Sequence, residues 1–153
     1  MEAMIPVRSS PHKTLRLHNI WVDGACPGNQ FRGPQPMGGG IVATCEGYRR
    51  EWSLPLGPGT NQLAEILVVS EALKRIKDRP AADVVVHSDS EYAIGCLTRR
   101  WKPKANLEAI AAAKALIAEC GRFRMVKVPG HSGIPENELA DRLAVQAISA
   151  NSD

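Results

Sequence analysis

The sequence predicts an α/β fold in which helices cover a mixed β-sheet. The expected elements follow one another as three strands, a helix, a strand, two helices, a strand and a helix, an order typical of a sheet with helical layers. The segment DVVVHSD, residues 83–89, has the continuous apolar run of a strand buried on both faces, as parallel strands are. Residues 60–77 and 137–148 carry apolar side chains at helical spacing.

Length and composition limit the class of protein. A chain of 153 residues fits one domain with a single core. The four cysteines lie far apart with no C-x-x-C pair, so we expect neither a disulfide framework nor a zinc site, and a reduced, cytoplasmic setting. No run approaches the ~18 apolar residues of a membrane span, and residues 1–10 lack the apolar core of a signal peptide. The net charge of +3 neither identifies nor opposes a nucleic-acid partner.

The N-terminal residues differ in composition from the rest of the chain. Residues 1–14 mix proline, serine and basic residues without periodicity, and we expect a poorly ordered extension there. It is too short and too poor in apolar residues to fold alone. We therefore expect residues 15–150 to form one domain with no separate domain before it.

Three strands are expected in the first third of the chain. The first runs from about Leu17 to Asp23 and is followed by a Gly- and Pro-rich loop over 24–39. Residues 40–44 and 48–54 then predict a hairpin. Asp23, at the end of the first strand, is either a turn aspartate, since Asp-Gly is a common hairpin signal, or the anchor of an active-site loop.

A helix of about four turns is expected between Thr60 and Lys77, with Thr60 or Asn61 as its N-cap. Asn61, Gln62 and Glu65 lie on one edge of this helix, off its apolar stripe. The stripe consists of Leu63, Ile66, Leu67, Val69, Leu73 and Ile76.

The second half predicts two more strands and three more helices. Asp89 ends the buried strand 83–89, at the carboxyl end where open α/β sheets bind ligands. A short helix over 90–98, an Ala-rich helix over 107–120 and a strand over 123–128 follow. After a loop at 129–133, the last helix has Asn137 and Asp141 at i, i+4 on a face other than its apolar stripe. That stripe contains Leu139, Ala140, Leu143, Ala144, Ala147 and Ile148.

Four carboxylates stand at the edges of apolar elements: Asp23, Glu65, Asp89 and Asp141. If they meet, each pair ~4 Å apart costs roughly 4 kcal/mol at an effective dielectric of 20, so the cluster needs cations. Carboxylate oxygens without thiolates favour Mg²⁺ or Mn²⁺, and a pair of such ions is a known device for phosphodiester displacement. The residues alone do not establish that the four acids are close in space.

The motifs VDGACPGN, TNQLAE, HSDSEY and VPGHSGIPENELAD resemble, in this order, those of the type 1 ribonuclease H family. The resemblance implies the ribonuclease H-like fold, a five-stranded mixed sheet whose first three strands are antiparallel. It also implies a catalytic domain that cuts the RNA strand of RNA/DNA hybrids, leaving 5′-phosphate and 3′-hydroxyl ends, with two Mg²⁺ ions for which Mn²⁺ can substitute. The residues that match the family's metal-binding acids are Asp23, Glu65, Asp89 and Asp141.

Further residues gain roles through the same resemblance. His131 matches a mobile histidine that assists proton transfer or product release, although a lone histidine is more often a surface or packed residue. Asn29, Asn61 and Gln62 match amides that contact the ribose, whose 2′-hydroxyl distinguishes RNA from DNA, but turn and cap roles explain Asn29 and Asn61 equally well. The rest of the expected substrate-binding set is Gly24, Cys26, Thr60, Ser90, Trp101 and Asn106. Thr60 and Asn106 match contacts to a DNA phosphate, and Pro58 stands where the family often has an arginine.

This chain departs from many type 1 members between residues 98 and 106, where the family's basic protrusion is missing. Arg99, Arg100, Lys102 and Lys104 surround Trp101 and are candidates to replace it, with charge for phosphates and a ring for a sugar or base. The alternative is a solvated basic linker with Trp101 packed inward.

We expect a monomeric endonuclease acting on RNA/DNA hybrid, without a membrane partner. Two alternatives remain open: a non-catalytic hybrid-binding module, and another nuclease of the same fold such as an integrase or a junction resolvase.

Overall fold

The computed structural model describes residues 14–30, 33–129 and 133–151. The expected N-terminal extension, apart from Thr14, and His131 lie outside the described residues. Of Asn29 only the backbone is described.

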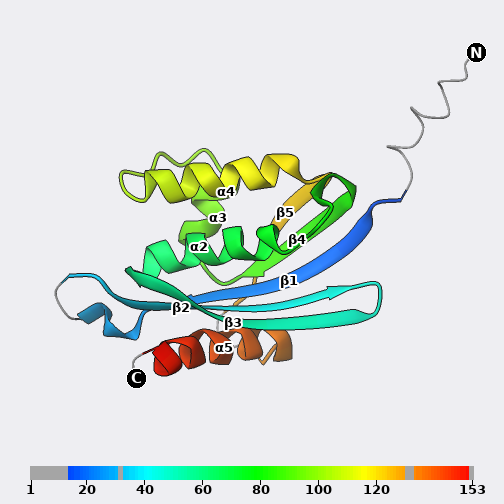
Figure 1. Cartoon of the computed structure of the whole chain (residues 1–153). Helices are drawn as coiled ribbons and strands as arrows, with labels where there is room; N and C mark the ends of the chain where they lie inside the picture. The colour runs from blue at the N-terminus through cyan, green and yellow to red at the C-terminus, as the bar shows by residue number, and fades with distance from the viewer. Residues whose placement is uncertain (1–13, 31–32, 130–132, 152–153) are drawn as a thin grey trace, which may run out of the picture.

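The described strands form one five-stranded mixed sheet (Figure 1). Its spatial order is β3-β2-β1-β4-β5. β1 pairs antiparallel with β2 and β2 with β3, while β4 lies parallel to both β1 and β5. The predicted fold class, with its first three strands antiparallel, is therefore confirmed. The strands are β1 (Arg16–Ala25), β2 (Gln35–Cys45), β3 (Tyr48–Gly59), β4 (Ala82–Ser88) and β5 (Arg122–Lys127).

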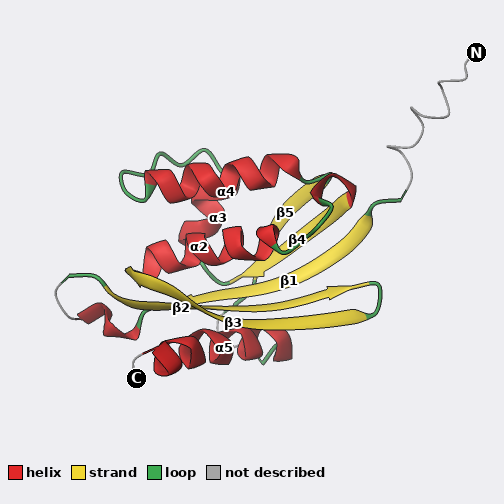
Figure 2. Cartoon of the chain, in the orientation of Figure 1, coloured by secondary structure: helices red, strands yellow, loops and turns green. Residues whose placement is uncertain are grey.

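Helices cover the sheet on both faces (Figure 2). Helices α2 (Asn61–Lys74), α3 (Glu91–Thr98) and α4 (Leu107–Glu119) lie on one face, and α5 (Pro135–Asn151) packs on the other, against β2, β1 and β3. Short 3₁₀ helices occur at Pro27–Gln30 (η2) and Arg79–Ala81 (η3). None of these described helices has the length and apolarity to span a membrane.

The main core lies between the sheet and α2, α3 and α4. β4 contributes Val84 and Val86 and is paired on both edges, which explains the continuous apolar run of its sequence. Burying one such side chain contributes about 1.5–3 kcal/mol. The largest fully buried members of this core are Ile20, Ile41, Ile66 and Leu73.

The predicted loop over 24–39 is wrong in its second half, because β2 begins at Gln35. The third strand was predicted over 48–54, but β3 continues to Gly59. The glycine content of this segment predicted a loop, but Gly38 and Gly40 allow close packing. A Cβ atom at Gly38 or Gly40 would collide with the α5 backbone, at the carbonyl oxygen of Ala144 or Ala140 respectively. Glycine therefore allows α5 to approach β2 closely.

The buried side of α5 matches this close approach. Ala140, Ala144 and Ala147 of the predicted stripe are buried, whereas Leu139 and Leu143 are only half-buried. Asn137, predicted to lie off the stripe with Asp141, is 4% exposed, so that prediction is wrong. Positions 137, 140 and 144 share one side of a helix, and small side chains there suit the glycines of β2.

Candidate active site

Three carboxylates meet at one end of the sheet, each supplied by a different element. Asp23 is in β1, Glu65 is in the second turn of α2, and Asp89 directly follows β4. One carboxylate oxygen of each lies within 4.8 Å of the others. Because β1 and β4 are parallel neighbours, their carboxyl ends coincide, and the acids at these ends become adjacent.

Gly24 sets the position of Glu65. Its backbone N–H donates a hydrogen bond of 3.0 Å to Oε1 of Glu65. A Cβ atom on Gly24 would stand 2.6 Å from the backbone carbonyl carbon of Ala64, too close for two non-bonded carbons. The absence of a side chain thus brings the second turn of α2 against β1, and Glu65 beside Asp23.

Asp141 reaches the same site from α5, on the opposite side of the sheet. It lines a cavity of about 320 Å³ together with Asp23, Glu65 and Asp89. A hydrogen bond and charge repulsion couple Asp141 to Asp23. The four acids predicted from the sequence are therefore brought together in one cavity.

The cavity makes the carboxyl groups of Asp23 and Glu65 hard to ionise. The pKa of Asp23 is raised to about 9. The largest cause is burial, followed by the charge of Glu65, hydrogen bonding to Asp141 and the charges of Asp89 and Asp141. Burial and the charge of Asp89 raise the pKa of Glu65 to about 8, against the opposing effect of the Gly24 N–H. In the absence of a cation, these groups retain protons at neutral pH that solvated carboxyls would have lost.

These residues fit a hard divalent cation. The converging atoms are all carboxylate oxygens, the ligand type preferred by small hard ions. A bound cation would also offset the repulsion that raises the pKa values of Asp23 and Glu65. Within the described part of the chain, no other cluster of His, Cys, Asp and Glu has such a geometry.

The predicted substrate residues near α2 differ in exposure. Asn61 lines the cavity, and Gln62 beside it is exposed. Thr60 is the N-cap of α2, since its Oγ1 accepts a hydrogen bond of 3.2 Å from the N–H of Leu63. Cys26 is 2% exposed, and its Sγ lies 3.6 and 3.5 Å from the backbone oxygens of Gln35 and Gly59, so the thiol is not free to contact a substrate.

A second group of predicted substrate residues lies around α3 and the start of α4. Ser90 caps α3, its Oγ accepting from the N–H of Ala93 at 3.0 Å. Nδ2 of Asn106 donates to the Tyr92 hydroxyl at 3.0 Å. Trp101 covers Gly95 of α3, where a Cβ would collide with its ring, yet the residue is 43% exposed. Trp101 therefore both packs on α3 and keeps an exposed surface.

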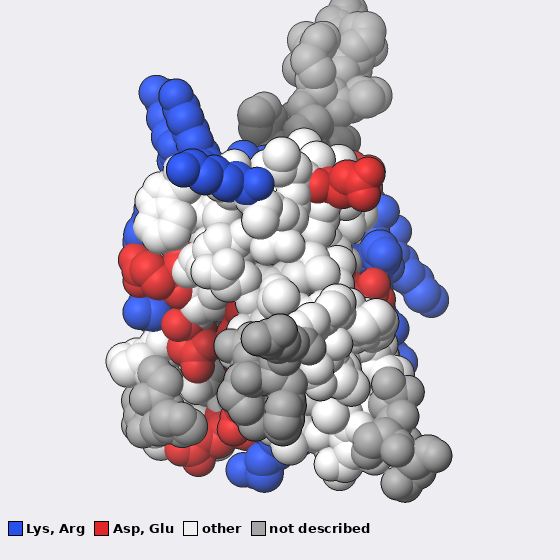
Figure 3. Space-filling model, turned by 90° about the vertical axis from the view of Figure 1, so that its left-hand side faces the viewer, with Lys and Arg blue, Asp and Glu red and all other residues white. Residues whose placement is uncertain are grey.

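Residues 99–106 link α3 to α4 without a helix between them. Arg99 forms an ion pair of 2.7 Å with Glu91, which also pairs with Lys127 at 3.2 Å. Arg100, Lys102 and Lys104 are exposed and form no ion pair with the described residues. Figure 3 shows this end of the molecule, with basic side chains projecting from its upper part and acidic side chains gathered below them.

Two further polar residues, Glu138 and Asn137, line the acidic cavity. Glu138 lies three residues before Asp141, a spacing that places both on one side of α5 and could have identified it from the sequence. Asn137 is buried with its Oδ1 lacking a hydrogen-bond partner. Its place beside Asp141 was predicted, but its burial was not.

Comparison with known proteins gives consistent results over most of the chain. The family model for RNase H matches residues 16–149. A ribonuclease H from Bordetella avium is 34% identical over 155 aligned residues, covering 93% of this chain and 97% of that protein. The crystal structure of RNase H1 from Halobacterium salinarum has a TM-score of 0.73 at 25% identity, with 88% of this chain and 98% of that chain covered. LC11-RNase H1, solved in complex with an RNA/DNA hybrid, has a TM-score of 0.73 at 26% identity, covering 89% of this chain and 99% of its own.

Proposed function

The chain belongs to the ribonuclease H family, and from this premise we propose that it hydrolyses the RNA strand of RNA/DNA hybrids by a two-metal mechanism at Asp23, Glu65, Asp89 and Asp141. The observation that carries this proposal is the convergence of Asp23, Glu65 and Asp89, whose carboxylate oxygens lie within 4.8 Å of one another. All four acids lie inside the segment that the family model matches.

The proposed cofactor is a pair of Mg²⁺ ions, with Mn²⁺ as a substitute. When bound, such a pair activates the attacking water and stabilises the charge that develops on the leaving 3′-oxygen. The carboxylates of Asp23, Glu65, Asp89 and Asp141 would hold the ions, and Gly24 keeps Glu65 in place through its N–H. The expected products carry a 5′-phosphate and a 3′-hydroxyl.

The proposed substrate is supported by LC11-RNase H1, whose structure was solved in complex with an RNA/DNA hybrid. Asn61, at the wall of the cavity, and Gln62, exposed next to it, offer donors and acceptors to a ribose 2′-hydroxyl. We assign the same role to Asn29, and contacts to the DNA strand to Thr60 and Asn106. Residues 15–150 are proposed to act as one catalytic domain in a monomer, with His131 assisting proton transfer or product release.

A cleavage assay tests this proposal. The protein is incubated with labelled RNA/DNA hybrid, double-stranded DNA or double-stranded RNA, first with Mg²⁺ and then with EDTA. We expect cleavage of the hybrid only, abolished by EDTA. End analysis should find 5′-phosphates on the RNA fragments. Cleavage of double-stranded DNA would indicate another nuclease of this fold, and tight binding of the hybrid without cleavage would indicate a non-catalytic module.

A further inference from the structure

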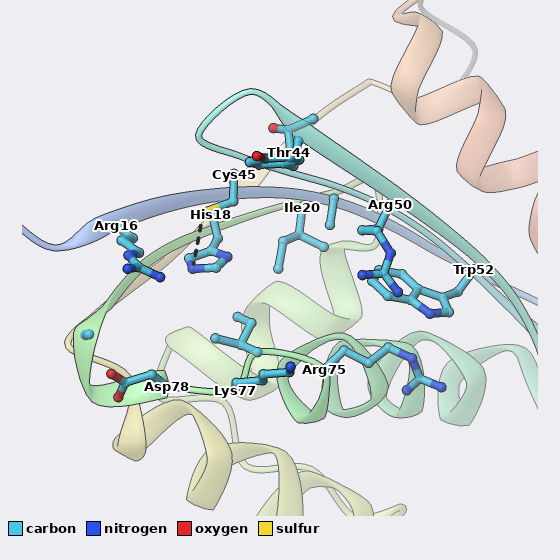
Figure 4. A pocket seen from close by; sticks show the side chains of 14 residues that line it. Arg16, His18, Ile20, Thr44, Cys45, Arg50, Trp52, Arg75, Lys77 and Asp78 are labelled. Atoms are coloured by element: carbon cyan, nitrogen blue, oxygen red, sulfur yellow. Dashed lines mark hydrogen bonds between the residues drawn. The ribbon is translucent and has the colours of Figure 1, made fainter.

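A second cavity, of about 450 Å³, lies at the other end of β1 from the acids (Figure 4). It opens between the C-terminal end of α2 and the face of the sheet on which α2 lies. His18 and Ile20 of β1 line it, whereas Asp23 lies further along the same strand. Asp23 lies five positions after His18 in the strand, roughly 16 Å away, and no residue lines both cavities, so the two cavities are distinct.

The inner wall of this cavity is apolar. Ile20 and Ile76 are 1% and 7% exposed, and Ala43 and Ala81 complete the surface between them. The volume is in the range of about 300–1,000 Å³ typical of small-molecule sites. An occupant therefore needs an apolar body.

The rim is cationic. Arg16, Arg50, Arg75 and Lys77 line the cavity, against one acidic residue, Asp78. Arg75 is paired with Glu71 at 2.9 Å, and Arg16 lies 3.8 Å from Glu46. Arg50 and Lys77 form no ion pair with any residue that the structure describes. Two uncompensated cations beside an apolar wall favour a ligand that carries a negative group.

The guanidinium groups are held in place before a ligand arrives. Those of Arg50 and Arg75 lie 5.3 and 5.6 Å from the ring centroid of Trp52. Arg75 also donates to the backbone oxygen of Glu71 at 2.9 Å. Such contacts reduce the conformational entropy lost when an anion binds.

His18 adds a polar group without a charge. Its Nε2 lies 3.6 Å from Sγ of Cys45 (Figure 4), and burial together with Arg16 lowers the pKa of the imidazole, which keeps the ring neutral at physiological pH. A neutral ring preserves the difference between an uncharged interior and a cationic rim.

We propose that this cavity binds a small amphipathic anion, with its carboxylate, sulfonate or phosphate group at Arg50 and Lys77 and its apolar body against Ile20 and Ile76. The proposal is independent of hybrid cleavage, because none of these residues belongs to the acidic cavity.

The probe 8-anilinonaphthalene-1-sulfonate combines a sulfonate with an aromatic body, and N-phenyl-1-naphthylamine has a similar body without the charge. Fluorescence titration of the full chain with both probes measures what the rim contributes. We expect saturable binding of one sulfonate probe per chain, and at least about tenfold weaker binding of the neutral probe, in line with charge-assisted hydrogen bonds.

The single variants Arg50→Ala and Lys77→Ala should each bind the sulfonate probe about tenfold more weakly than the unaltered chain does. Both residues are exposed, so their replacement leaves the core unchanged, and circular dichroism checks the fold. Lys114→Ala, at an exposed cation of α4 outside the cavity, is the matched control and should bind as the unaltered chain does. Equal affinity for the two probes, or equal effects of Lys114→Ala and Lys77→Ala, would overturn the proposal.

Competition against the bound sulfonate probe distinguishes two sources of the natural ligand. Displacement by adenosine 5′-monophosphate indicates a phosphorylated planar ligand, and displacement by decanoate indicates an acyl carboxylate. If neither compound displaces the probe at millimolar concentration, the cavity does not bind phosphorylated or carboxylated amphipathic ligands, and the proposal fails.

Discussion

Asp23 is the residue on which the acidic cavity depends most directly, since it contacts acids from both faces of the sheet. Asp23→Asn keeps the shape of the side chain and removes its charge, so we expect hybrid cleavage in Mg²⁺ to fall by more than about 100-fold, because the loss of a mere outer-shell partner of a metal ligand already costs about 10–100-fold. A fluorescence cleavage assay measures the rate. Turnover like that of the unaltered chain would rule out a metal-binding role for this carboxylate.

The same substitution should stabilise the chain when no metal is present. An asparagine side chain cannot ionise, so the change removes a carboxyl that burial and the charges of Glu65 and Asp89 keep from ionising in the folded chain, although it ionises freely after unfolding. We expect the midpoint of thermal unfolding in EDTA at pH 8 to rise by at least about 2–4 °C, the equivalent of 1 kcal/mol for a chain of this size. Glu71→Gln is the contrasting control, because Glu71 is stabilised by Lys74 and Arg75 and its loss should lower the midpoint.

The difference between predicted and observed secondary structure is largest where packing, rather than local preference, decides the conformation. Asp23 and Asp89 could be found from the sequence because apolar runs end at them, and Glu65 and Asp141 because they lie beside apolar helical stripes in motifs that resemble those of the family. The strand at 35–39 could not, because glycine has low strand propensity and the close approach of α5 explains glycine at position 38. The burial of Asn137 was missed for the same reason, since it depends on how closely α5 approaches β2.

Adjacent glycines of β2 allow a direct test of this packing. A Cβ at Gly40 would meet backbone atoms of α5, which cannot move without the whole helix, whereas one at Gly39 would meet the side chains of Val68 and Leu56 at 3.0 and 3.2 Å. Gly40→Ala should therefore reduce the free energy of unfolding by at least about 1–3 kcal/mol, as overpacking does, and Gly39→Ala by less. Urea denaturation measures both; the reverse order would contradict the role given to Gly40.

The α3–α4 connection offers a prediction at the scale of an element. Arg100, Lys102 and Lys104 have no ion pair with the described residues, whereas Arg99 is engaged by Glu91. If the connection contacts substrate phosphates, changing the three free cations to alanine should flatten the log-log salt dependence of hybrid binding by up to about three units, near 0.9 per phosphate. Fluorescence anisotropy in EDTA measures the slope without cleavage. Arg99→Ala, the control, should change the slope less. An unchanged slope in the triple variant would indicate that the connection is a solvated linker.

At the scale of the whole molecule, the acidic cavity makes stability depend on pH and on metal. Asp23 and Glu65 have pKa values of about 9 and about 8 in the folded chain, well above the ordinary values of 3.8 and 4.5 that apply after unfolding. Between these limits the folded state holds more protons than the unfolded state. Raising the pH therefore favours unfolding, and the stability that these two groups contribute when protonated is lost as pH rises through 8 and 9.

We accordingly expect the metal-free chain to unfold at a temperature at least about 5 °C lower at pH 9 than at pH 6, since each unit of unequal pKa corresponds to about 1.4 kcal/mol. Saturating Mg²⁺ should raise the midpoint more at pH 9 than at pH 6, because it binds the ionised carboxylates and adds RT ln(1 + [L]/Kd) only where they are available. Differential scanning calorimetry in EDTA and in Mg²⁺ at both pH values measures these effects. In the double variant Asp23→Asn/Glu65→Gln both the fall with pH and the stabilisation by Mg²⁺ should be reduced, and a fall of the same size would place its origin outside the acidic cavity.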